Sequence, residues 1–114
     1  MARERKRGNA DLHRKAAALA EQARFMLYEV GQPVRGRDLY ARAGILESEA
    51  WRRNPQGRGR TGSILAVSAA TCFSKAERWF LLRLFAAEVF ATEPGEWAQG
   101  EIEKLLTEVP AERA

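Results

Sequence analysis

Residues 12–30 read LHRKAAALAEQARFMLYEV, and the spacing of their apolar side chains decides the fold class. The apolar positions are Leu12, Ala16, Leu19, Ala23, Met26 and Val30. They recur at intervals of four, three, four, three and four residues, as along one face of an amphipathic helix. Asn9 or Asp11 can cap the start of this helix, and Gly31 followed by Pro33 can end it. The sequence therefore predicts a helix of about 20 residues.

The C-terminal half of the chain also favours helices. Residues 63–73 are rich in alanine and are predicted as a helix, although their small and apolar side chains leave a strand open. Ser74 and Glu77 form a capping-box pattern, which predicts a helix over residues 75–91. That helix is apolar nearly all round, as is typical of a core helix or a dimer seam. With a last helix over residues 96–109, we expect an all-α fold of five or six helices that ends in a helical hairpin.

The length and composition of the chain predict a single domain. It has 114 residues, of which 46% are hydrophobic and 30% are charged, enough apolar material for one core. We expect a disordered basic arm over residues 1–8, a helical domain over residues 9–110 and a short tail over residues 111–114.

The sequence also predicts a cytoplasmic location. The longest apolar run, residues 79–91, is interrupted by Arg83 and Glu88 and is shorter than the ~20 residues that a membrane span needs. No apolar segment follows the charged N-terminus, so a secretory signal is not expected. The single cysteine, Cys72, excludes an internal disulfide framework and fits a reducing compartment.

The two halves of the chain differ in the sign of their charge. Residues 1–60 hold 14 Lys and Arg against 7 Asp and Glu, a net charge of +7, whereas residues 61–114 hold 5 against 8, a net charge of −3. A basic half joined to a mildly acidic half indicates a surface for a polyanion beside a packing or partner-binding segment.

Residues 37–53 are interpreted as a helix-turn-helix-like segment. Two short helices would flank a tight turn at Gly44, and the second helix, capped by Ser48, would present Arg52 and Arg53 to a DNA groove. Residues 32–53 resemble the generic helix-turn-helix core of bacterial regulators. An ordinary helical corner is the equal alternative, because bulky Tyr40 stands where such proteins usually keep a small residue.

Residues 57–62 spell the G-x-G-x-x-G phosphate fingerprint. A dinucleotide site needs a hydrophobic strand before this loop, and the preceding residues do not form one. What remains is a glycine loop that brings Arg58 and Arg60 to a helix N-terminus, where backbone N–H groups can bind an anion. The alternative is a surface loop that arginine keeps soluble.

These basic clusters together predict a nucleic-acid-binding protein. The leading hypothesis is a regulatory, helix-turn-helix-like DNA-binding protein, with DNA favoured over RNA. One alternative is a small basic helical subunit of a nucleoprotein complex that holds the backbone without reading sequence. Another is a protein-only adaptor or inhibitor of phage or plasmid type. The candidate nucleic-acid-binding residues are Arg3, Arg5, Lys6, Arg7, Arg35, Arg37, Arg52, Arg53, Arg58 and Arg60.

No enzyme activity, cofactor or metal is expected. His13 is the sole histidine and lies beside Arg14 and Lys15, which favours a solvated helix face over a general base. Cys72 lies in an apolar run, where a buried thiol is the ordinary outcome. The predicted partners are nucleic acid and, through the helices of residues 75–109, a second copy or a larger assembly, with no membrane.

Overall fold

The computed structural model describes residues 2–54 and 59–113, and side chains within these ranges from Gly8 to Glu112. Every regular element in the described part is a helix, which confirms the predicted all-α fold. Five α-helices form the domain, joined by one π-helical turn and followed by one 3-10 turn. The elements are α1 (Ala2–Phe25), η1 (Met26–Val30), α2 (Pro33–Arg53), α3 (Gly59–Lys75), α4 (Trp79–Phe90), α5 (Glu96–Thr107) and η2 (Ala111–Arg113).

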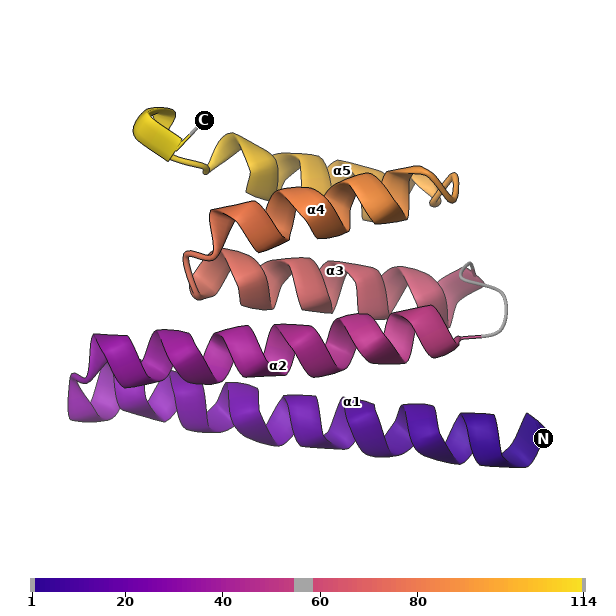
Figure 1. Cartoon of the computed structure of the whole chain (residues 1–114), viewed down its shortest axis with the longest axis horizontal. Helices are drawn as coiled ribbons and strands as arrows, with labels where there is room; N and C mark the ends of the chain where they lie inside the picture. Colours follow the sequence, from indigo (N-terminus) through magenta and orange to yellow (C-terminus); the bar gives the residue numbers. More distant parts are fainter. Residues whose placement is uncertain (1, 55–58, 114) are drawn as a thin grey trace.

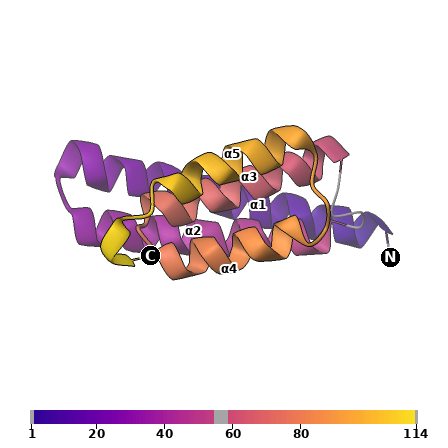
Figure 2. The same ribbon diagram turned by 90° about the horizontal axis from the view of Figure 1, so that it is seen from above.

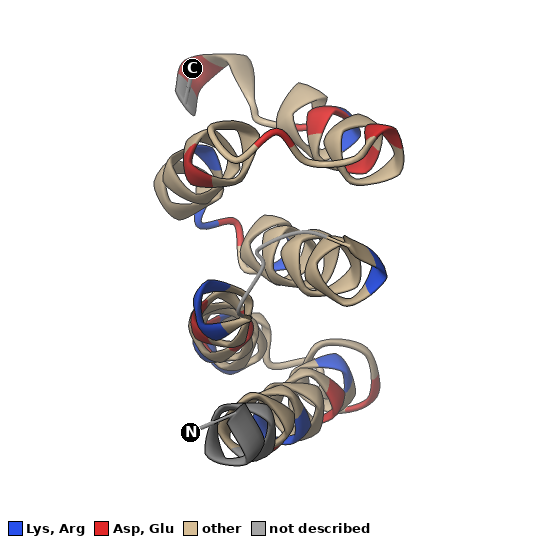
Figure 3. Cartoon of the chain, turned by 90° about the vertical axis from the view of Figure 1, so that its right-hand side faces the viewer, with Lys and Arg blue, Asp and Glu red and all other residues tan. Residues whose placement is uncertain are grey.

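The five α-helices run alternately up and down the long axis of a molecule measuring 42 × 29 × 18 Å (Figure 1). Viewed from one end, α1, α2 and α3 are stacked, and α4 and α5 form a final layer on α3 (Figure 3). Figure 2 shows α4 and α5 side by side over α3, so the predicted C-terminal hairpin is present. None of the described helices is both long and apolar enough to cross a membrane.

The end of the first helix follows the sequence closely. Gly31 adopts a left-handed conformation with φ of +72°, and Pro33 begins α2, as expected for a glycine stop followed by a proline start. The last five residues before Gly31 widen into the π-helical turn η1, which the periodicity did not predict.

The N-terminal boundary is different from the prediction. The backbone of α1 begins at Ala2, so the helix shows no break between the predicted arm, residues 1–8, and the domain. The side chains of residues 1–7 lie outside the described part, and their contacts with nucleic acid stay a prediction.

The predicted turn at Gly44 is wrong, because α2 is one continuous helix from Pro33 to Arg53. A Cβ added at Gly44 would lie 2.8 Å from two ring carbons of Phe73 on α3. The glycine therefore serves the close packing of α2 on α3 and not a change of chain direction. The two short helices of the helix-turn-helix interpretation are halves of this single helix.

The predicted capping box at Ser74 is also wrong. Ser74 is buried in the last turn of α3, and the chain turns three residues later, where Glu77 has a left-handed φ of +56°. The Glu77 N–H donates to the Ser74 carbonyl at 2.9 Å, and the Arg78 N–H donates to the Phe73 carbonyl at 3.0 Å. This pair of bonds is the Schellman arrangement that ends a helix. The signal at residues 74–77 thus marks the end of α3, and α4 begins at Trp79.

The core lies mainly between α3 and its neighbours. The rings of Trp51 on α2 and Phe85 on α4 pack edge-on, with centroids 5.4 Å apart. The ring of Phe73 on α3 packs edge-on against the same Phe85 ring, with centroids 6.0 Å apart. A second cluster fills the space between α1, α2 and the end of α3. Of the two predictions for this apolar helix, the central core helix is wrong, because Phe80 of α4 is 72% exposed and Leu84 is 53% exposed. The dimer seam stays a prediction. The helices covered on both sides are α2 and α3 (Figure 3).

Candidate nucleic-acid interface

The structure divides the predicted basic residues between two ends of the bundle. Arg35 and Arg37 lie in the first turns of α2, and Arg52 and Arg53 lie in its last turn. Eighteen residues of helix separate Arg35 from Arg53, which corresponds to about 27 Å. The ten predicted residues therefore do not form one continuous site.

One end, here called the basic end, is where α1 and α3 begin and α2 finishes (Figure 1). A Cβ added at Gly8 would lie 3.8 Å from the Arg53 guanidinium, so the start of α1 meets the end of α2. Arg60 lies in the first turn of α3. Arg3, Arg5, Lys6 and Arg7 belong to the first turns of α1, where side chains lie outside the described part. Arg58 lies outside the described residues.

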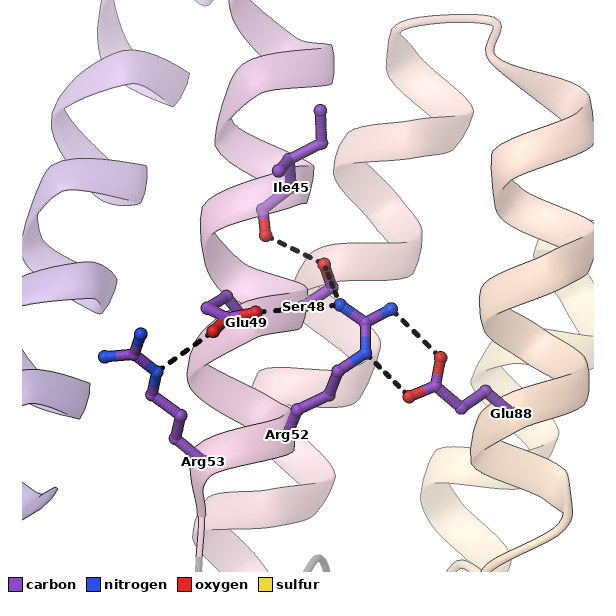
Figure 4. Close-up of polar contacts among 6 residues, drawn as sticks. All are labelled: Ile45, Ser48, Glu49, Arg52, Arg53 and Glu88. Atoms are coloured by element: carbon purple, nitrogen blue, oxygen red, sulfur yellow. Dashed lines mark hydrogen bonds and ion pairs between the residues drawn. The ribbon is translucent and has the colours of Figure 1, made fainter.

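The guanidinium of Arg52 is already occupied by the protein (Figure 4). Its Nε and Nη2 donate to the two carboxylate oxygens of Glu88 on α4 at 2.7 and 2.9 Å, a bidentate ion pair. Its Nη1 lies 3.4 Å from the Ser48 hydroxyl. Hydrogen bonding to Glu88 raises the pKa of Arg52. This arginine clamps α2 to α4, and base reading would require breaking the clamp.

Arg53 and Arg60 are more accessible to an anion. Arg53 donates to Glu49, one turn earlier on α2, at 3.0 Å, and both side chains are about half exposed. Exposed pairs of this kind contribute little to stability, so a phosphate can compete with Glu49. Arg60 is exposed, and no acidic partner for it occurs among the described residues.

The opposite end carries both signs of charge. Arg37 pairs with Glu77 at 3.3 Å, and Arg78 pairs with Asp38 at 2.6 Å. Arg35 is exposed beside them. These ion pairs join the start of α2 to the α3–α4 connection. The basic end also carries carboxylates, because Glu88 lies in the last turn of α4 and Glu96 opens α5 at that end.

The sequence did not reveal a buried polar centre that joins the first three helices. The Glu47 side chain is 3% exposed, and its carboxylate accepts hydrogen bonds from His13 Nδ1 on α1 at 2.9 and 3.1 Å. The Ser68 hydroxyl on α3 donates to the same carboxylate at 2.8 Å. Because Ser68 contacts the carboxylate and not the imidazole, the cluster lacks the nucleophile–base contact of a hydrolase triad. It is an anchor between helices.

The other candidates for chemistry have structural roles in the part that the structure describes. Cys72 is buried, and loss of water around it raises the pKa of the thiol to about 12, so it stays protonated at neutral pH. No group of three His, Cys, Asp or Glu side chains is arranged to hold a metal ion among the described residues.

A pocket of about 420 Å³ lies at the basic end between α1 and α3. It was not predicted, because its residues come from three separate segments of the sequence. Its lining is largely apolar but includes two asparagines whose amide groups are partly unsatisfied. The lining residues are Asn9, Ala10, His13, Asn54, Thr61, Ile64 and Leu65.

Comparisons with known proteins give no family for this chain. No protein-family model, no curated protein and no solved structure matches it.

Proposed function

We propose that this protein binds the phosphate backbone of nucleic acid at the basic end, as a small helical subunit of a nucleoprotein assembly. The observation that carries the proposal is the meeting of basic segments far apart in the sequence. The start of α1 contacts the last turn of α2 at Gly8 and Arg53, and the basic stretch of residues 3–7 precedes that contact in the same helix. Arg60 opens α3 at the same end.

The helix directions favour the same ligand. The N-termini of α1 and α3 both point toward the basic end (Figure 1). Helix N-termini carry free N–H groups and a partial positive charge, and they attract phosphate. Arginine side chains add bidentate hydrogen bonds to phosphate oxygens, with no need for a defined base sequence.

The geometry of α2 argues against a major-groove reader. A recognition helix must expose one face along its length to enter the groove. Here α2 is packed between α1 and α3, with ten of its 21 residues buried, and its Arg52 is held by Glu88. The backbone-binding alternative is therefore preferred over a sequence-specific regulator.

Exposed apolar side chains support membership of a larger assembly. Phe80 and Leu84, one turn apart on α4, and Trp97 on α5 are each more than half exposed. Large apolar residues on the surface favour contact with another protein. They lie within residues 75–109, the segment predicted to mediate assembly.

The test is the salt dependence of binding to nucleic acid. Each phosphate contact contributes about 0.9 to the slope of log affinity against log salt on duplex DNA, and about 0.7 on single strands. The double variant Arg53→Ala, Arg60→Ala should flatten this slope by about 1.4 to 1.8.

The matched control is the double variant Arg35→Ala, Arg42→Ala. It removes the same charge from exposed positions elsewhere on α2, and its slope should equal that of the unaltered protein. Equal flattening by both variants would reduce the proposal to a general effect of net charge, and no binding at low salt would overturn it.

A further inference from the structure

Helix α2 carries a regular stripe of five side chains on its outer surface. They recur at intervals of four, three, four and three residues, which places them along one side of the helix. Four of them are exposed, and the fourth in order, Glu49, is partly exposed. In chain order the members of this α2 stripe are Asp38, Arg42, Ile45, Glu49 and Arg52.

Two ion pairs show which way the α2 stripe faces. Asp38 at its start accepts a hydrogen bond from Arg78, the residue before α4, and Arg52 at its end donates to Glu88 of α4. Helices α2 and α4 lie on the same side of the bundle (Figure 2 and Figure 3). Leu84, one turn before Glu88 and 53% exposed, adds apolar surface there. The stripe therefore belongs to a broad side of the molecule, here called the α2–α4 side.

The charges of the α2 stripe are complementary to those of the same stripe turned end over end. Their order is negative, positive, neutral, negative and positive, with Ile45 at the centre. When two copies lie antiparallel, Asp38 of each chain faces Arg52 of the other, and Arg42 faces Glu49. Ile45 then meets Ile45. In a parallel pair each charge would face its own sign, so only the antiparallel order is attractive.

We infer that the α2–α4 side binds a second copy of the chain in an antiparallel, two-fold arrangement with Ile45 at the symmetry axis. A two-fold contact requires a surface that is complementary to itself, and the α2 stripe meets this requirement. The contact removes from water two copies of Ile45, which is 53% exposed in the single chain. Arg42 has no acidic partner within the described part of the chain, and Glu49 of the second copy supplies one.

The α2–α4 side is large enough for a stable contact. The molecule measures 42 × 29 Å along its two longer axes, and this side spans both of them (Figure 1). A stable protein interface buries about 800 Å² on each partner, which is less than this outline. An apolar centre with charged residues around it is typical of interfaces between chains that also fold alone. We therefore expect a reversible dimer.

Sedimentation equilibrium of the full chain, without nucleic acid, tests the dimer. The unaltered protein should pass from one chain to two as its concentration rises through the micromolar range. Ile45→Lys places two like charges at the axis and should abolish the dimer, whereas Lys104→Glu, at an exposed position on α5, should leave it unchanged. An unaltered protein that is monomeric at every concentration would overturn the inference and leave the α2–α4 side to a different protein.

Charge reversal tests the antiparallel order. Arg42→Glu and Glu49→Arg each make two contacts repulsive by symmetry, and each should raise the dissociation constant of the dimer at least about tenfold. Mixed in equal amounts, the two variants should form a heterodimer, because one then carries only negative charge at these two positions and the other only positive charge.

The chain that carries both reversals should dimerise like the unaltered protein, and circular dichroism should show that every variant keeps its helices. Dimers of unchanged affinity in both single variants would place the contact elsewhere and overturn the inference. Equal weakening by Lys104→Glu would reduce the result to an effect of net charge, and would overturn it too.

The inference names the partner in the assembly proposed above, and it rests on the proposed function only in that respect. A dimer that binds no nucleic acid at low salt would support the inference and overturn the backbone function, whereas a monomer with salt-dependent binding would do the reverse. The antiparallel order points the two basic ends in opposite directions, so each end contacts nucleic acid on its own. Loss of the dimer should therefore leave the salt slope of each chain unchanged.

Discussion

Helix α2 is rich in charged residues and yet well buried, whereas helix α4 is apolar and yet largely exposed. The 21-residue α2 contains five arginines, yet ten of its residues are buried, including the carboxylate-bearing Glu47. The 12-residue α4 contains one arginine and is the most apolar helix of the chain, yet only four of its residues are buried. Hydrophobicity along a helix therefore does not decide its place in this bundle.

The difference arises from side-chain size and from position in the stack. Small residues line the contacts of α2, where Ala43 and Ala50 are fully buried and Gly44 touches the ring of Phe73. They let α1 and α3 approach α2 from both sides. By contrast, α4 lies at the edge of the stack, so it packs bulky side chains such as Phe85 inward and leaves Phe80 outside (Figure 3).

The largest expected effect tests the two faces of α4. Phe85→Ala should cost roughly 3–5 kcal/mol, because the ring is 2% exposed and contacts both Trp51 and Phe73. Phe80→Ala, at a position 72% exposed, should change stability by less than about 0.5 kcal/mol. Urea unfolding of both variants measures the difference. An equal cost would mean that a partner covers the outer face of α4 in solution.

The next largest effect tests whether water is excluded from the contact between α2 and α3. The pKa of Cys72 is raised from 9.0 to about 12, first by burial and then by the nearby Glu47 carboxylate. A group whose pKa is raised on folding contributes stability that is complete below pH 9 and is lost as the pH rises toward 12. Stability should therefore fall by about 2 kcal/mol between neutral pH and about pH 10.5.

The control for this pH effect is Cys72→Ala. Burial also raises the pKa of Tyr40, so this residue too lowers the stability of the fold at high pH. The effect of Cys72 alone is the difference in stability between the unaltered protein and the variant at each pH. Parallel alkaline curves for both would show that water reaches the thiol, and that α2 and α3 are less tightly joined than the structure shows.

The sequence predicted the elements that depend on local signals. The apolar spacing from Leu12, the stop at Gly31 and the final helix over residues 96–109 all correspond to observed helices within a few residues, apart from the earlier start of α1. The alanine-rich stretch 63–73 is a helix, as predicted. These features follow from periodicity and from backbone preference, which a short window contains.

The errors share one physical cause, which is that local signals were overruled by contacts from distant helices. Gly44 looks like a turn until Phe73, 29 residues later, occupies the space where its Cβ would be. Glu77 looks like part of a cap at the start of a helix, but it takes the left-handed position after α3 and pairs with Arg37. No window that lacks both partners contains this information.

The same limit applies to the candidate site, which stays a prediction. Composition placed the positive charge in the first half of the chain, but it did not show that Arg52 is bound to Glu88 or that Arg35 lies about 27 Å from Arg53. The pocket between α1 and α3 left no sequence signal. Its two asparagines are 45 residues apart and become neighbours only through the antiparallel packing of α1 and α2.

The smallest expected effect compares glycines inside two helices. Alanine is favoured over glycine by about 1 kcal/mol in a helix interior, so both Gly44→Ala and Gly100→Ala gain helix stability locally. At Gly100 on α5 nothing lies within 4 Å of the new Cβ, and that variant should be more stable by about 0.5–1 kcal/mol. At Gly44 the new Cβ would meet two ring carbons of Phe73 at 2.8 Å, and that ring is held against Phe85.

Gly44→Ala should therefore lose about 1–2 kcal/mol in spite of its better helix propensity. In the double variant Gly44→Ala, Phe73→Leu the smaller side chain should relieve the clash and recover part of the lost stability. The two substitutions should therefore be coupled in a double-mutant cycle. Thermal or urea unfolding of the four proteins gives the coupling energy. Additive effects, or a Gly44→Ala variant as stable as Gly100→Ala, would show that α2 and α3 can move apart, and that small residues do not set the spacing that buries α2.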